Sequence, residues 1–313
     1  MPPTFDTGLA LLVFAVAAWT IAAPSTFTAV DGFIAYGLLL ALVWLRLAAP
    51  DVALTEAALG SGLTGGLLVG ASAHPSRSEA PTACGGPGMT LRWAAAGLCM
   101  LVSAGLAAIV LLLPEPAPTL APQAATNIAA TGLGNPVTAV LMAYRAIDTL
   151  LEVVVLLLAL IGVWSVTSDR LWGGLLGSSH IADQNRLLTF VAQLLVPIGI
   201  LIGIHIFWVG SVAPGGEFQG ATILAAMGIL AVMAGLVETP GINRRWARVL
   251  LVAGPAVFLT VGLAGFAFAG GFLAYPLYYA KLLILAIEVP LTLSIAAMLV
   301  LLVVGASERS LQR

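Results

Sequence analysis

Nine runs of apolar residues, each long enough to cross a lipid bilayer, constrain this chain more than any other feature. About 18 or more consecutive apolar residues are typical of a membrane-spanning helix. Of the 313 residues, 60% are hydrophobic and only 8% are charged, whereas a soluble domain carries about 25% charged residues. We therefore predict an all-α polytopic membrane protein with about nine transmembrane helices. The predicted spans are 7–23, 31–48, 51–72, 91–113, 137–165, 187–210, 215–237, 247–271 and 276–305.

Basic residues are distributed unevenly between the predicted loops. Nine of the twelve fall in alternate loops, at the edges of those loops or in the tail, and the loops 114–136, 211–214 and 271–275 hold none. Lys and Arg accumulate on the cytoplasmic side of a membrane. We therefore predict an external amino terminus, a cytoplasmic carboxyl terminus and a multi-pass protein of the inner (plasma) membrane. The first run lacks a basic n-region, so we interpret it as a retained span.

Polar stretches divide the spans into blocks of three, two and four. The segment 74–88 is predicted to be a cytoplasmic linker, and 168–185 a cytoplasmic loop with an amphipathic surface segment. The segment 114–127, PEPAPTLAPQAATN, is predicted to be external and too rich in proline to form a helix. The sequence shows no internal repeat of the kind that marks stand-alone secondary transporters.

The residue types that build soluble active sites form no recognisable motif. Cys84 and Cys99 form no CxxC, and the three histidines have no metal-ligand spacing. The sequence contains no P-loop, no GxGxxG after a strand and no HExxH. We therefore expect no cofactor, no metal and no nucleic-acid partner.

Two acids stand near the start of the third predicted span. An ionisable residue inside a span costs several kcal/mol unless it is paired or hydrated. In APDVALTEAALG, Asp51 follows Pro50 at a helix start, where negative charge is stabilising, and we interpret it as a capping acid. Glu56 lies six residues after Pro50, roughly 9 Å deeper. It is either part of an ion path or a member of a structural pair, for example with Arg46.

Three further charges occur together in AYRAIDTLLEVVV. Arg145, Asp148 and Glu152 are spaced i, i+3 and i+7, which places them on one face of a helix. By residue count Asp148 is expected near the bilayer centre. This face must therefore meet protein or water. Arg145 and Asp148 are interpreted as a structural pair, which leaves Glu152 as a protonatable site.

The last predicted span carries a base and an acid seven residues apart. Lys281 and Glu288 share a helix face, and Pro290 frees a backbone carbonyl close to Glu288. A functional and a structural interpretation stay equally open for Glu288. Lys281 is expected about one turn inside the external end, where it either joins the ion path or extends to the membrane surface.

The stretch VGSVAPGGEFQG, residues 209–220, joins two predicted spans through a very short external hairpin. Glycines supply backbone freedom for the turn, and proline suits a first helical turn. An acid and a glutamine can meet the free amides at the start of the following helix. The polar turn residues are Pro214, Gly215, Gly216, Glu217, Gln219 and Gly220.

The same hairpin carries a resemblance to a known family. PGGEFQGA, followed by an apolar helix, resembles the PGGGFQGG signature of the MnhB/MrpB subunit of multi-subunit Mrp-type Na+/H+ antiporters and of the related membrane-bound hydrogenase subunit. The resemblance extends over about 187–305, and Glu217 stands where the family usually has glycine.

Two more stretches resemble partner modules of that family. DGFIAYGLLLALVWLRLAAPDVALTEAALGSGL is similar to the MbhD module, and NPVTAVLMAYRAIDTLLEVVV is similar to MbhE, with Leu151 where glycine is usual. The chain thus resembles a fusion of three subunits. The expected domains are a three-helix MbhD-like module over 1–73, a two-helix MbhE-like module over 91–167 and a four-helix MnhB-like module over 187–306.

The resemblance implies a component of a membrane arm, whose first two modules are similar to subunit J of respiratory complex I. In such complexes buried acids and bases line an ion path shared between subunits, and the matching motifs carry this role to Glu56, Asp148 and Glu152. The implied partners are large antiporter-like subunits, a small subunit similar to subunit K of complex I, and lipid.

Three hypotheses follow. The chain is an ion-path subunit of a Mrp-type cation/proton antiporter, or the same module in a redox-driven complex such as a membrane-bound hydrogenase. Alternatively, it is a scaffold that seals larger subunits together and conducts nothing. Iron–sulfur subunits beside it would indicate the redox complex, and neutralising the buried acids would separate conduction from scaffolding.

Overall fold

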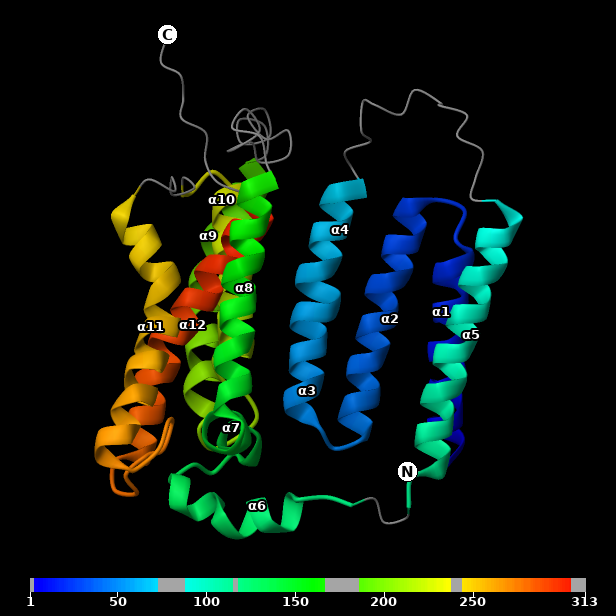
Figure 1. The fold of residues 1–313 in the computed structure, drawn as a ribbon. Coiled ribbons are helices and arrows are strands. Elements are labelled where there is room, and N and C mark those ends of the chain that lie inside the picture. Colours follow the sequence, from blue (N-terminus) through cyan, green and yellow to red (C-terminus); the bar gives the residue numbers. More distant parts are fainter. Residues whose placement is uncertain (1–2, 73–87, 115–117, 167–185, 238–243, 305–313) are drawn as a thin grey trace. The chain divides into compact units, whose positions relative to one another are not determined.

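The computed structural model describes residues 3–72, 88–114, 118–166, 186–237 and 244–304, and these residues form helices and their connections without any strand. Figure 1 shows the helices in chain order. The first half contains α1 Pro3–Ala22, α2 Thr26–Arg46, α3 Pro50–Thr55, the π-helix η1 Glu56–Leu63, α4 Thr64–Ser72, α5 Met89–Leu112, α6 Ala121–Asn127 and the 3-10 helix η2 Ile128–Thr131. The second half contains α7 Pro136–Ala139, the π-helix η3 Val140–Tyr144, α8 Ala146–Val166, α9 Arg186–Val209, α10 Glu217–Met233, α11 Arg245–Phe268 and α12 Ala280–Val304.

Each of the nine predicted spans overlaps one helix or a run of consecutive helices. In the described part of the chain, eight helical segments are long and apolar enough to cross a membrane, with α3, η1 and α4 counted as one. The helix α10 is a shorter apolar segment of 17 residues. The prediction of an all-helical protein with about nine spans is therefore confirmed.

The chain divides into two compact units. One unit contains residues 1–74 and 127–313, and the other contains 75–126 with α5 and α6. The expected middle module 91–167 is thus shared between them, because α8 packs on α11 and α12 in the first unit.

The expectation that 114–127 contains no helix is wrong. Residues Ala121–Asn127 form α6, in which Pro122 is the second residue. Proline is tolerated in the first helical turn, where its missing N–H would have no partner. Thr119 Oγ1 also accepts a hydrogen bond from the backbone N–H of Ala121 (3.1 Å). The prolines therefore precede or begin the helix and do not interrupt it.

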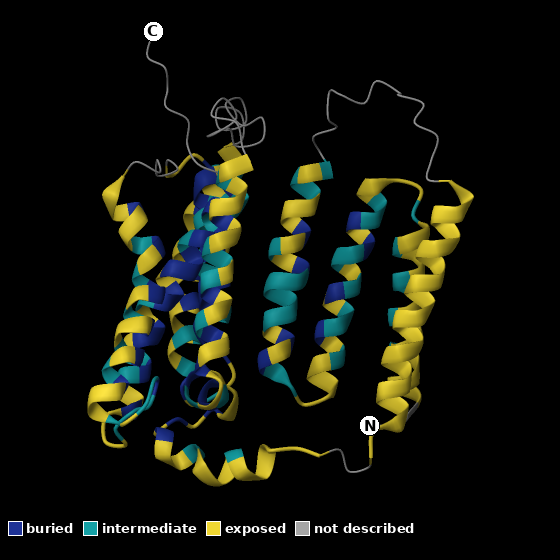
Figure 2. Cartoon of the chain, in the orientation of Figure 1, coloured by how far each residue is buried: buried dark blue, intermediate teal, exposed yellow. Residues whose placement is uncertain are grey.

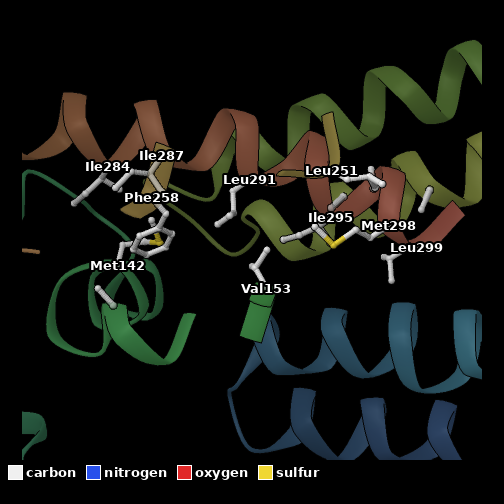
Figure 3. Packing of buried hydrophobic residues seen from close by; sticks show 14 of the residues in the cluster. Met142, Val153, Leu251, Phe258, Ile284, Ile287, Leu291, Ile295, Met298 and Leu299 are labelled. Atoms are coloured by element: carbon white, nitrogen blue, oxygen red, sulfur yellow. The ribbon is translucent and has the colours of Figure 1, made fainter. Parts of the chain in front are cut away.

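The core of the first unit is built around α12. This helix is predominantly apolar and is the most buried of the candidate spans, as Figure 2 shows. It packs against α8, α10 and α11. In Figure 3, Phe258 of α11 lies with Met142, Ile284 and Ile287. The outer helices keep large apolar side chains exposed, which suits contact with lipid or with other membrane subunits.

The helical segment formed by α7 and η3 leads into α8, and it is interrupted at Arg145. The π-helix η3 ends there with non-helical dihedrals (φ −126°, ψ 32°). Freed backbone carbonyls in membrane proteins need new donors. Leu141 O accepts from Thr149 Oγ1 (2.8 Å), and Met142 O accepts from Tyr275 Oη (2.9 Å). Asp148, expected near the middle of one continuous helix, consequently lies in the first turn of α8.

Helices α3, α8, α10 and α12 begin at the same end of the first unit, and α9 and α11 begin at the opposite end (Figure 1). The described basic residues Arg186, Arg244, Arg245 and Arg248 stand at the starts of α9 and α11. This arrangement agrees with the uneven charge distribution in the sequence, and the orientation in the membrane stays a prediction.

Candidate functional site

Asp51 is the centre of a polar junction between distant segments. Its side chain comes from the start of α3 and is only 6% exposed. Asp51 Oδ1 accepts hydrogen bonds from Gly215 N (2.9 Å) and from Asn135 Nδ2 (3.2 Å). The predicted capping acid therefore binds two segments that follow it much later in the chain.

A second set of hydrogen bonds surrounds this carboxylate. Gln219 Nε2 donates to Asp51 O (3.3 Å) and to Thr55 Oγ1 (3.0 Å). Asn135 Nδ2 also donates to Ala213 O (3.0 Å). Gln219, expected to meet the amides of its own helix, instead reaches across to α3. The junction thus joins α3, the segment before α7 and the α9–α10 hairpin.

The glycines of the hairpin are required by its backbone. Gly215 and Gly216 have φ values of +145° and +141°, which residues with a side chain rarely adopt. A Cβ on Gly220 would collide with Phe207 of α9, so this glycine permits close packing of α9 and α10. Pro214, predicted in the first helical turn, stands before it, because α10 begins at Glu217.

Arg46 and Glu56 do not pair. Arg46 Nε donates to Asp6 Oδ1 (2.6 Å), and the partner acid comes from α1. Glu56 is half-buried at the start of η1, and its Oε1 lies close to Gly37 of α2. Beside it, Ser61 Oγ is buried with no hydrogen-bond partner among the described residues. π-helical turns often occur at functional sites, and Glu56 remains an ion-path candidate.

Arg145 and Asp148 form the pair that their spacing indicated. Arg145 Nε lies 2.5 Å from Asp148 Oδ2, and the two side chains are 70% and 52% exposed. They line a cavity of about 450 Å³ beside the helix break, together with Phe272 and Leu273. A polar hollow of this size has room for several waters.

Three acids from different helices approach one another inside the first unit. Glu217 of α10 and Glu288 of α12 lie within side-chain hydrogen-bonding reach of each other, and they are only 3% and 2% exposed. Glu152 of α8 is close enough to interact electrostatically with Glu217, and its own side chain is exposed on the surface of the chain. The acids thus connect an exposed helix face with the core.

Tyr275, in the connection between α11 and α12, stands beside this group. Burial, and after it the negative charge of Glu288, raise the pKa of Tyr275 above its usual range. The hydroxyl therefore keeps its proton and donates to Met142 O. Lys281 is not part of the group: its side chain is exposed and lies against Gly132.

The sequence does not predict two of the contributing residues, and it predicts another role for a third. Asn135 directly precedes Pro136, which is a helix-start signal, and its Oδ1 caps α7 by accepting from Val137 N (2.9 Å). Nothing in the local sequence pairs Tyr275 with Met142. Glu217 was predicted as a turn residue, and its contact with Glu288 depends on how α10 packs against α12. Among the described residues, no three His, Cys, Asp or Glu side chains are grouped to hold a metal ion.

The fold and these polar groups define a class: a multi-pass membrane protein with ionisable side chains inside its helix bundle. Two family models specify it further. Residues 11–76 match MbhD, a component of MBH, and residues 187–307 match a domain related to the MnhB subunit of Na+/H+ antiporter. The chain therefore contains an MbhD-like region and an MnhB-related domain, as two of its three motifs predicted.

Similar proteins were found by sequence and by structure. The uncharacterized protein MJ1307 of Methanocaldococcus jannaschii is 31% identical over 153 residues, which cover 44% of this chain and 58% of that protein. A chain of the Mrp complex from Dietzia sp. DQ12-45-1b matches with a TM-score of 0.70 and 24% identity, covering 97% of this chain and 35% of that chain. A chain of the membrane-bound sulfane sulfur reductase (MBS), an archaeal respiratory membrane complex, matches with a TM-score of 0.57 and 23% identity, covering 71% of this chain and 100% of that one.

Proposed function

We propose that this chain is a membrane subunit of a multi-subunit Mrp-type cation (Na+)/proton antiporter, in which it contributes part of a buried ion path and contacts to other subunits. The observation that carries the proposal is the series of three carboxyl groups that begins at exposed Glu152 and continues to the buried Glu217 and Glu288. The MbhD and MnhB matches support it. The chain transforms no substrate chemically.

The path begins at the break before α8. The hollow beside Arg145 and Asp148 is large enough for water and extends to the first turn of α8. Glu152 stands one turn further along the same helix, roughly 9 Å from its start. A carboxyl group in this position can take up a proton or coordinate a cation from the hollow. Asp148, which is paired with Arg145, attracts cations to the entrance.

The exposed charges on α8 also support a partner contact on this side of the helix. A charged side chain that faced lipid at the centre of a membrane helix would cost about 3 kcal/mol. Arg145, Asp148 and Glu152 are all exposed on the isolated chain, so this side is covered by another polar membrane subunit. Large antiporter-like subunits, and a small subunit similar to subunit K of complex I, fit this requirement.

The second candidate function is the same ion path within a redox-driven complex. The shared fold with a chain of the sulfane sulfur reductase complex favours it. Purification of the native complex in mild detergent, followed by mass spectrometry of its subunits, separates the two. Antiporter-like subunits without iron–sulfur proteins support the antiporter, whereas iron–sulfur subunits select the redox complex. A single chain that transports ions alone in liposomes would contradict both.

A further inference from the structure

We propose that Glu217 and Glu288 form an internal proton-binding site, in which the two carboxyl groups hold one proton between them. The site lies inside the MnhB-related domain. Glu217 is the first residue of α10 and Glu288 is the ninth residue of α12, and these two helices pack against each other.

Among the residues that the structure describes, no cation is paired with these two acids. The ion pairs among the described residues are Arg46–Asp6 and Arg145–Asp148, and neither involves these acids. Lys281, seven residues before Glu288 on α12, is exposed and lies against Gly132. Two other ionisable groups face the pair, namely Glu152 of α8 and Tyr275 of the α11–α12 connection. Glu152 adds negative charge. The Tyr275 hydroxyl donates its hydrogen bond to Met142 O and not to the pair.

Two ionised carboxylates that lie side by side in the buried core are energetically unfavourable. Burial removes the hydration of each charge, and like charges in contact repel strongly where water is excluded. One proton replaces this repulsion with an O–H···O⁻ hydrogen bond, which is among the shorter and stronger kinds in proteins. The remaining negative charge is stabilised at Glu217, which interacts with a backbone N–H at the amino end of α10.

Glu152 gives this site a connection to the exterior. It is the exposed member of the three acids and acts electrostatically on Glu217. A proton that leaves the pair breaks an O–H bond there and forms one on the Glu152 carboxylate, directly or through water, with no change of redox state. The exchange of a proton with Glu152 rests on the proposed ion-path function. The presence of a proton on the Glu217–Glu288 pair does not.

Difference infrared spectroscopy of the purified complex at neutral pH tests the site. A protonated carboxylic acid has a carbonyl stretch that is separate from carboxylate bands and shifts in D2O. We expect Glu217→Gln and Glu288→Gln each to lose one such band, because the amide donates the hydrogen bond and leaves a single carboxylate. Asp6→Asn is the control: it removes an exposed, ion-paired carboxylate and should lose no protonated band.

Each outcome decides the proposal. If neither Gln variant loses a protonated-carboxyl band, the pair holds no proton and the site is overturned. Gln has the shape of protonated Glu, so failure of both variants to assemble would also contradict it. Loss of the band together with loss of ion transport supports both the site and the exchange with Glu152. Loss of the band with normal transport keeps the proton site and overturns the exchange.

Discussion

Asp51 Oδ1 accepts a hydrogen bond from the backbone N–H of Gly215 at 2.9 Å, although the two residues are 164 positions apart in the chain. Asp51 belongs to the MbhD domain and Gly215 to the MnhB-related domain. The carboxylate thus links the start of α3 to the α9–α10 hairpin. Gly215 and Gly216 of this hairpin have backbone φ angles that residues with a side chain rarely adopt. The two domains are held together by this buried contact as well as by the continuous chain.

Replacing Asp51 with Asn should weaken the junction. A charged acceptor contributes about 1.5–3 kcal/mol to a buried hydrogen bond, and the amide of Asn would face the donors Gly215 N and Asn135 Nδ2. We expect a lower temperature for heat-induced dissociation of the purified complex. Asp6→Asn, which removes an exposed pair, should change that temperature little. Equal shifts in the two variants would argue against the junction.

Tyr275→Phe should change how stability depends on pH. Since the pKa of Tyr275 is raised, the folded protein keeps a proton that an unfolded tyrosine releases near pH 10. The folded state then binds more protons, so this group stabilises fully below about pH 10 and loses that contribution as pH rises. The variant is expected to be less stable at about pH 8, because Met142 O loses its donor, and to approach the wild type above about pH 10. Parallel melting curves from about pH 8 to about pH 11 would contradict this.

How far the sequence predicts the structure depends on the range of the interaction. Long apolar runs predict the spans because each run must be helical in lipid, and a spacing of three residues predicts the Arg145–Asp148 pair. The break at Arg145 was not predicted, since its freed carbonyls are satisfied by Thr149 and by the distant Tyr275. The partner of Arg46 also comes from another helix. Contacts of this kind require the packed structure.

The orientation in the membrane is open to direct measurement. The charge distribution predicts that a tag on the carboxyl terminus is cytoplasmic and that a label within 115–127 is external. A cysteine introduced at Thr119, in a chain without Cys84 and Cys99, should react in intact cells with a reagent that does not cross membranes. A protease-sensitive tag at the carboxyl terminus should be cut only in inverted vesicles. Finding both positions on one side would refute the nine-span topology.

Arg145→Ala tests whether the exposed side of α8 is a subunit contact. The substitution leaves Asp148 without its ionic partner. If another subunit covers this side, an unpaired charge becomes buried in the complex, which costs about 3–5 kcal/mol, and less assembled complex should appear on a native gel. If the side faces water, the amount should not change. The double variant Arg145→Ala/Asp148→Ala removes both charges and should recover part of the assembly.

The ion path depends on the carboxyl groups that line it, and the scaffold alternative does not. Glu56→Gln and Asp148→Asn should therefore reduce transport by assembled complexes in vesicles, with Asp6→Asn as a control outside the path. Normal transport in both of these variants and in Glu152→Gln would favour a scaffold that conducts nothing.

Transport by the Glu152→Gln variant tests the central claim most directly. Glu152 is the exposed acid next to the buried pair, and Gln keeps its size and hydrogen bonding but cannot titrate. The measurement is cation-driven proton movement in membrane vesicles, divided by the amount of assembled complex on a native gel. We predict that the variant assembles normally and transports little or nothing. Normal transport per assembled complex would contradict an ion path through Glu152.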